Sequence, residues 1–66
     1  MLQGIMNLDT GKTLYFYANT PYIAMEKLKY YLALSDKSAE KCIINKTDSN
    51  LHLYLDFKGQ RYCIRI

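Results

Sequence analysis

Residues 51–66, LHLYLDFKGQRYCIRI, carry the most regular alternation in the sequence, with a large apolar side chain at every second position from 51 to 57. Successive side chains of a strand point to opposite faces, so this pattern predicts a strand with one buried face. Lys58-Gly59 then predicts a two-residue turn into a second strand, QRYCIRI. The stretch therefore predicts a β-hairpin with one apolar face.

The two-residue turn also predicts which residues face each other across this hairpin. The predicted pairs on the apolar face are Phe57–Gln60, Leu55–Tyr62, Leu53–Ile64 and Leu51–Ile66. The predicted pairs on the reverse face are Asp56–Arg61, Tyr54–Cys63 and His52–Arg65. One face is thus apolar at every position except Gln60 beside the turn, as a buried face requires.

The segment before this hairpin, KCIINK at residues 41–46, predicts a further antiparallel strand. We expect a two-residue loop at Asp48-Ser49 to join it to the hairpin. The expected neighbours are Ile44 with Leu53 and Cys42 with Leu55 on the core side, and Ile43 with Tyr54 and Asn45 with His52 on the other side.

The N-terminal half predicts two strands and the helix. Strands are expected at residues 2–8 and 12–18, separated by the turn DTGK at residues 9–12. In the following segment Thr20 suits the N-cap of a helix and Pro21 its first position, and the helix should end near Leu34. Its expected core-facing stripe is Pro21, Ala24, Met25, Leu28, Tyr31, Leu32 and Ser35.

These elements predict one small α+β domain over residues 1–66. Their order is β-β-α-β-β-β, which favours a two-layer sandwich with one helix packed on a mainly antiparallel sheet of about five strands. A chain of 66 residues buries a modest core and gains from association when it has no disulfide or metal.

The cysteines, the length of the apolar runs and the net charge bear on the cellular compartment and the kind of partner. Cys42 and Cys63 are expected on opposite faces of the sheet, so we interpret them as reduced thiols of a cytoplasmic protein. No apolar run has the length of a membrane span, and we expect no membrane association. The formal net charge of +3 permits an acidic partner without requiring one.

The solvent-facing side of the sheet is the first candidate site. Its residues in the C-terminal strands are Ile43, His52, Tyr54, Arg61 and Arg65. One interpretation is a protein-binding face with aromatic anchors. The alternative is single-stranded nucleic-acid binding, with bases stacking on tyrosines and arginines holding phosphates. The residues for that alternative are Tyr15, Tyr17, Tyr54, Arg61 and Arg65. An Asp56–Arg61 pair would neutralise one arginine, which favours a protein partner or a plain solvated surface.

The back of the helix is the second candidate site. Ile23, Tyr30 and Leu34 lie opposite the core stripe, with Lys27 between them. Such a helix is apolar on two sides, so its back predicts contact with a second subunit or another protein. The alternative is that a terminal segment or the loop at residues 35–40 folds over part of it.

Catalytic and metal chemistry find little support in the sequence. His52 is the single histidine and would lie diagonally across from Cys63, but a flat sheet face offers no enclosed pocket or oxyanion donors. Cys42, His52 and Cys63 follow no metal-ligand spacing, and no cofactor motif is present. DTGKT at residues 9–13 lacks the upstream glycine of a phosphate-binding loop and precedes a strand. The sequence therefore predicts a non-enzymatic interaction module, such as an adaptor, inhibitor or regulatory protein, that binds another protein or a second copy of itself.

Overall fold

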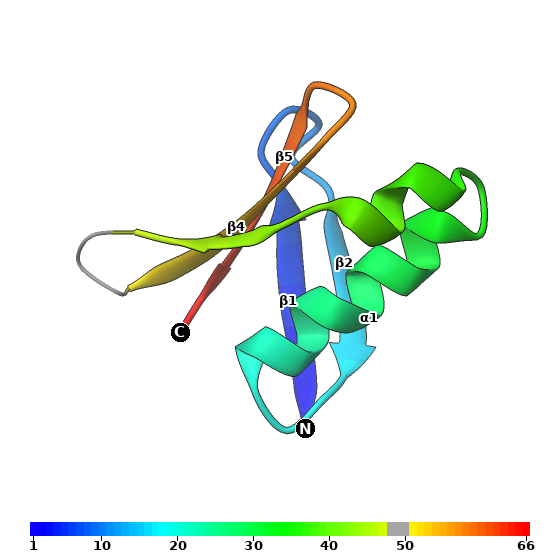
Figure 1. Cartoon of the computed structure of the whole chain (residues 1–66). Helices are drawn as coiled ribbons and strands as arrows, with labels where there is room; N and C mark the ends of the chain where they lie inside the picture. Colours follow the sequence, from blue (N-terminus) through cyan, green and yellow to red (C-terminus); the bar gives the residue numbers. More distant parts are fainter. Residues whose placement is uncertain (48–50) are drawn as a thin grey trace.

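The computed structural model describes residues 1–47 and 51–66, and within them it contains five strands, one α-helix and one 3₁₀ helix (Figure 1). In chain order the elements are β1 (Leu2–Asn7), β2 (Thr13–Tyr17), α1 (Pro21–Ala33), η1 (Lys37–Lys41), β3 (Ile44–Lys46), β4 (His52–Phe57) and β5 (Gln60–Arg65). The predicted α+β order of strands around one helix is confirmed.

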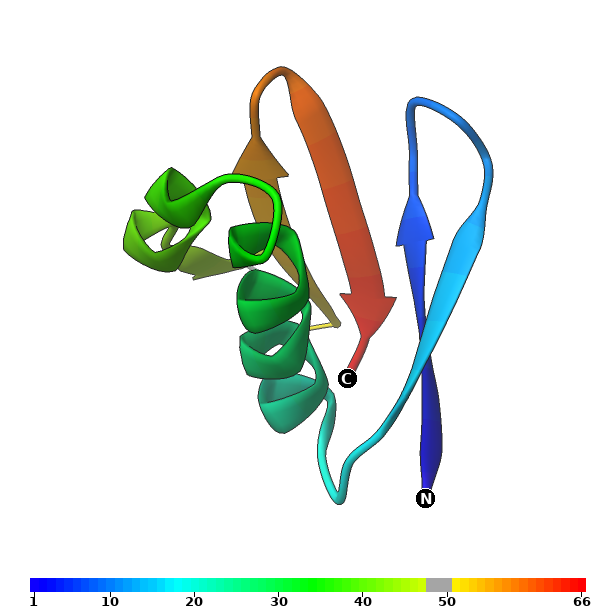
Figure 2. The same cartoon turned by 90° about the vertical axis from the view of Figure 1, so that its right-hand side faces the viewer.

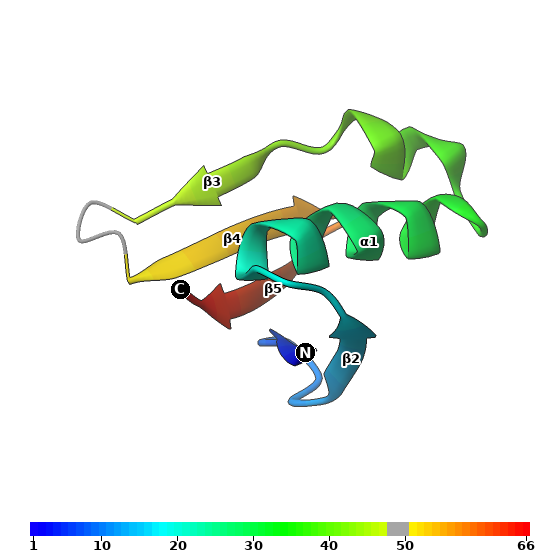
Figure 3. The same cartoon turned by 90° about the horizontal axis from the view of Figure 1, so that it is seen from below.

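The strands form one antiparallel sheet in the order β2-β1-β5-β4-β3, and α1 packs across one of its faces (Figures 1 and 3). The two hairpins thus meet in the middle of the sheet, where β1 lies beside β5. This order places the chain's first strand next to its last, an arrangement that the alternation of side chains does not specify.

The β4–β5 hairpin has the predicted register at every position. Lys58 and Gly59 form its turn with φ angles of 50° and 77°, the left-handed values that a two-residue turn of the mirror-image type needs. The pairing continues beyond the strands, because the Ile66 amide donates to the Leu51 carbonyl at 2.9 Å.

The predicted start of the third strand is wrong. Lys41 ends the 3₁₀ helix η1, and β3 begins only at Ile44. The Asp36 side chain caps η1 by accepting from the Ser38 amide at 3.0 Å. An Asp two residues before a Ser is therefore the local sequence signal of this turn.

The predicted register of β3 on β4 is also wrong, by two residues. Ile44 faces Leu55 rather than Leu53, and Asn45 faces Tyr54 rather than His52. A shift of two residues leaves every side chain on its predicted face, so the apolar pattern alone does not distinguish the two registers. The predicted loop at Asp48-Ser49 lies outside the described residues.

The N-terminal half follows the sequence prediction closely. Gly11 has a φ of 76° in the β1–β2 turn, a value that glycine adopts without strain. The Thr20 hydroxyl accepts from the Ile23 amide at 3.1 Å and caps α1, with Pro21 in the first turn.

The core lies between α1 and the inner face of the sheet. From the helix it takes Ala24, Met25 and Leu28, all completely buried. From the strands it takes Ile5, Leu53, Leu55, Tyr62 and Ile64. Leu32 and Phe16 pack against this cluster, and Tyr31 contacts the Phe16 ring edge-on at 6.1 Å. The predicted core stripe of the helix is therefore confirmed at its central positions.

The two hairpins share only a short pairing. The residue pairs between β1 and β5 are Met6–Cys63 and Asn7–Tyr62, and from there toward the two ends of the chain the strands diverge (Figure 1). In the described part of the chain, α1 is too short to cross a bilayer and no other helix has the length and apolar character to do so.

Candidate functional site

The face of the sheet that points away from α1 is the candidate site, and we call it the outer face. No other element of the described chain packs across it (Figures 1 and 3). By the register, its residues are Leu2, Gly4, Met6, Thr13, Tyr15, Tyr17, Asn45, His52, Tyr54, Asp56, Arg61, Cys63 and Arg65.

One row of directly facing residues crosses all five strands of the outer face. It runs through Thr13, Met6, Cys63, Tyr54 and Asn45, each paired with the next in the sheet. Directly opposite side chains in an antiparallel sheet lie about 4.5–5.5 Å apart, so this row is a continuous surface. It joins the aromatic side chains of the N-terminal hairpin to Tyr54 in the C-terminal one.

The N-terminal part of the outer face is apolar and exposed. Tyr15 and Tyr17 keep 64% and 74% of their surface accessible, and Leu2 and Met6 are also exposed. Tyr15 lies over Gly4, because a Cβ added at Gly4 would come within 3.0 Å of its ring carbon Cε1. A side chain at position 4 would displace this ring, which gives the glycine a packing role.

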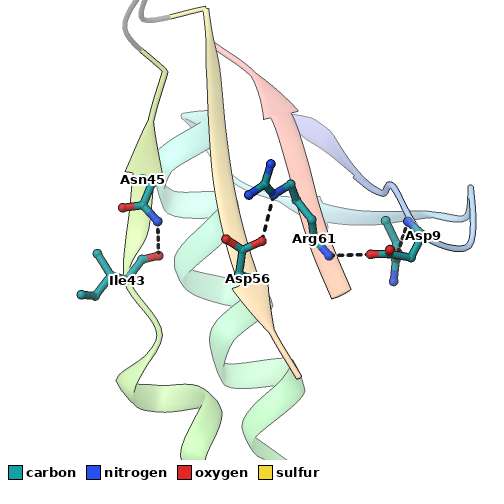
Figure 4. Close-up of polar contacts among 6 residues, drawn as sticks. Asp9, Ile43, Asn45, Asp56 and Arg61 are labelled. Carbon is teal, nitrogen blue, oxygen red and sulfur yellow. Dashed lines mark hydrogen bonds and ion pairs between the residues drawn. The ribbon is translucent and has the colours of Figure 1, made fainter. Parts of the chain in front are cut away.

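The C-terminal part of the outer face contains an ion pair. The Arg61 Nε donates to Asp56 Oδ1 at 2.9 Å, and the Arg61 backbone amide donates to Asp9 Oδ2 at 2.8 Å (Figure 4). The guanidinium also lies over the Tyr54 ring, 5.3 Å from its centroid. Asp56 raises the pKa of Arg61 by hydrogen bonding and charge. Arg61 is therefore engaged by a carboxylate and an aromatic ring.

His52 and Arg65 complete this end of the face. The His52 ring lies 6.1 Å from the Tyr54 ring, tilted by 34°. Arg65 faces His52 across β4 and β5 and is exposed. Arg61 is paired with Asp56, whereas Arg65 makes no ion pair with any of the described residues.

The remaining predicted sheet residue, Ile43, lies before β3 and is highly exposed. The two-residue change in register places Asn45, not Ile43, opposite Tyr54. The Asn45 side chain donates to the Ile43 carbonyl at 3.5 Å (Figure 4). The predicted contact of Ile43 with Tyr54 is therefore wrong, because β3 is displaced along β4.

The helix-back residues are exposed as a group but have different surroundings. Leu34 keeps 85% of its surface accessible, and Tyr30 and Ile23 are also exposed. Lys27 donates from Nζ to the Tyr17 carbonyl and so turns toward the edge of β2. A depression of about 190 Å³ lies beside Tyr30, lined by Glu26, Lys29, Tyr30 and Glu40. Two carboxylates and a lysine make this side of the helix more polar than the apolar pattern predicted.

Leu2 and Met6 are the large apolar residues of the outer face that sequence reasoning missed. Both belong to the predicted first strand, but their place on the site depends on β1 lying between β2 and β5. The signal that could have identified them is parity, since Leu2, Gly4 and Met6 alternate with the buried Ile5.

The titratable side chains of the outer face include His52 and Cys63, which lie on neighbouring strands. His52 and Cys63 are diagonal neighbours as predicted, since Cys63 faces Tyr54 and His52 faces Arg65. Within residues 1–47 and 51–66 no three His, Cys, Asp or Glu side chains are placed to hold a metal. Cys42 and Cys63 are both free thiols, with Cys42 packed against the core and Cys63 on the outer face.

The architecture is that of a small α+β protein whose sheet is covered on one side. No family model matches the chain, and neither a curated protein nor a solved structure is significantly similar to it.

Proposed function

We propose that this protein is a non-enzymatic interaction module that binds another protein through the outer face of its sheet. The observation that carries the proposal is the band of exposed apolar side chains from β1 and β2 on a face that no described element covers. Exposed apolar patches rimmed by polar residues are typical of protein-binding surfaces. Aromatic residues such as Tyr15, Tyr17 and Tyr54 are the side chains that most often dominate binding energy.

The charge of the outer face favours a protein over a nucleic acid. Phosphate chains are held by several free cationic groups, whose counterions are released on binding. On this face Asp56 neutralises Arg61, and the Arg61 guanidinium is stacked on Tyr54. No residue that β1 and β2 contribute to the outer face is charged. We therefore treat single-stranded nucleic acid as the competing outcome of the test.

The outer face is a better candidate than the helix back. The helix-back patch contains three exposed apolar side chains, and the depression beside it is lined by charged residues. Two free cysteines on opposite sides of the sheet suit a reducing compartment, so we propose that the contact is made in the cytoplasm.

Photo-crosslinking tests the proposal directly. A benzophenone amino acid replaces Met6, at the centre of the outer face, and in a matched variant it replaces Tyr30 on the helix back. After irradiation of the cells that make the protein, we expect position 6 to give a discrete adduct that resists nuclease and is destroyed by protease. An excess of the untagged wild-type chain should compete for this adduct, whereas an excess of Met6→Glu should not.

Two results would contradict the proposal. One is an adduct at position 6 that nuclease removes, which would favour the nucleic-acid alternative; its binding should then weaken steeply as salt rises. The other is a competed adduct at position 30 with none at position 6, which would move the partner to the helix back.

A further inference from the structure

The two edges of the sheet are built differently. The β3 edge has three residues and includes the exposed Lys46, and short edge strands with lysines resist pairing with another chain. The β2 edge has five residues, TLYFY, without charge or proline. In Figure 2 β2 lies toward the viewer, with no other element drawn across it. β3 is therefore short and carries a lysine of its own, whereas β2 is longer and none of its own residues is charged.

The hydrogen-bond pattern of the hairpin shows which backbone groups of β2 face outward. The Asn7 amide donates to the Lys12 carbonyl and the Ala18 amide to the Met1 carbonyl, both at 2.8 Å. In an antiparallel pair the bonded residues alternate with unbonded ones. The residues of β2 that make no backbone hydrogen bond to β1 are therefore Thr13, Tyr15 and Tyr17, and their amides and carbonyls point away from β1.

An independent contact supports this direction. Lys27 from α1 reaches the free edge and donates to the Tyr17 carbonyl. That carbonyl has a second lone pair and can accept another hydrogen bond. No partner within the described chain is recorded for the amide or the carbonyl of Tyr15, at the centre of the edge.

We infer that the β2 edge pairs antiparallel with β2 of a second copy, about a two-fold axis at Tyr15. The outward residues at positions 13, 15 and 17 are symmetric about that point. Each Tyr15 amide then donates to the Tyr15 carbonyl of the other copy, and Thr13 exchanges bonds with Tyr17 of the other copy. A strand edge that is self-complementary in this way satisfies the symmetry that a two-fold dimer requires.

The side chains beside this edge suit a second copy of the same chain. On the outer face Tyr15 and Tyr17 are exposed, and cross-strand aromatic pairs stabilise antiparallel sheets. On the inner face Phe16 and the half-exposed Tyr31 form an apolar border. Because β2 itself carries no charge, the two copies meet without like-charge repulsion at the axis.

The inference goes beyond the proposed function, because the dimer extends the sheet edgewise and leaves the outer face uncovered. A foreign protein can bind the outer face whether or not the β2 edges pair. The experiment therefore changes a backbone group and leaves every side chain of the outer face in place.

The test is methylation of a single backbone nitrogen. The chain is assembled from two synthetic peptides joined at Cys42, with N-methyl-Tyr15 in one version. This methyl group removes the outward donor and blocks the edge, but it leaves the β1–β2 hydrogen bonds intact. The matched control carries N-methyl-Lys46, whose amide also points outward, on the β3 edge, since the neighbouring Thr47 amide is the one bonded to β4.

We expect the wild-type chain and the N-methyl-Lys46 control to sediment as dimers with the same dissociation constant. N-methyl-Tyr15 should raise that constant about 10- to 100-fold, through the loss of two symmetric hydrogen bonds. Circular dichroism checks that each version folds. In the unmodified chain, hydrogen exchange at the Tyr15 amide should slow as concentration rises, while the internally bonded Leu14 amide stays slow throughout.

Three results would overturn the inference. They are a wild-type chain that stays monomeric up to millimolar concentration, a dimer that N-methyl-Tyr15 does not weaken, and a dimer that both methylated versions weaken equally.

Discussion

The inner and outer faces of the sheet are made by the same strands, and both carry large apolar side chains. On the inner face Ile5, Leu53 and Leu55 are almost completely buried because α1 covers them. On the outer face Leu2 and Met6, from the same strand as Ile5, remain about half exposed. Alternation within a strand therefore separates the two faces, but only the position of the helix decides which face forms the core.

The largest expected difference between the faces is in stability. Leu55→Ala removes a completely buried side chain and leaves a cavity, so it should lower the free energy of unfolding by about 2–5 kcal/mol. Met6→Ala removes an exposed side chain and should lower it by less than about 1 kcal/mol. Urea unfolding followed by circular dichroism measures both. Equal losses would show that the outer face is part of the core.

A buried polar residue on the inner face provides the second prediction. The Asn7 Oδ1 accepts from the Asp9 and Thr10 amides at 2.9 and 3.2 Å, and its Nδ2 donates to Gln60 Oε1 at 3.1 Å. Asn7→Ala removes these three hydrogen bonds and should lower the free energy of unfolding by about 1–3 kcal/mol. Gln60→Ala removes only the contact with Nδ2, together with the hydrogen bond that Gln60 Oε1 accepts from the Tyr62 hydroxyl at 3.2 Å.

The comparison of these two variants by urea unfolding tests how the hairpins are joined. We expect Asn7→Ala to be clearly less stable than Gln60→Ala, because Asn7 also organises the β1–β2 turn. If Gln60→Ala is equally unstable, the contacts of Gln60 with Asn7 and Tyr62 dominate and the turn contributes little.

The register of the C-terminal hairpin was predictable because its two-residue turn allows a single pairing. The register of β3 was not, because a displacement of two residues keeps Ile44 on the core side and satisfies the same apolar pattern. The 3₁₀ helix η1 was missed because one short turn has no hydrophobic periodicity. Its signal was local, in the Asp36 cap of Ser38.

The candidate site was predictable by face but not by extent. The parity of Tyr54, Arg61 and Arg65 followed from the hairpin, and the structure confirms their placement on one face. The apolar half of the site depends on β1 pairing with β5, a contact between residues more than 50 positions apart that local pattern does not encode. For the same reason the sequence did not predict that β2 is an edge strand of the sheet.

The smallest expected effect lies at the rim that joins the helical layer to the sheet. Lys58 in the β4–β5 turn donates to the Asp36 carboxylate, which also accepts from Ser38. These bonds lower the pKa of Asp36 from 3.8 to about 2. A carboxylate with a lowered pKa stabilises the fold fully above its ordinary pKa, and this contribution is lost as pH falls through the folded-state value.

Asp36→Asn isolates this contribution, because asparagine caps a helix nearly as well as aspartate but carries no charge. The urea midpoint of wild type should lie slightly above that of Asp36→Asn at neutral pH, and the gap should close between about pH 4 and pH 2. When both chains carry Lys58→Met, the difference between their urea midpoints at neutral pH should be smaller. Adding Lys58→Met to Asp36→Asn should therefore lower the midpoint little further. A gap that persists unchanged at pH 2 would mean that asparagine is simply a poorer cap than aspartate, and that the charge of Asp36 contributes nothing to stability. The covered face would then be held by packing and neutral hydrogen bonds alone.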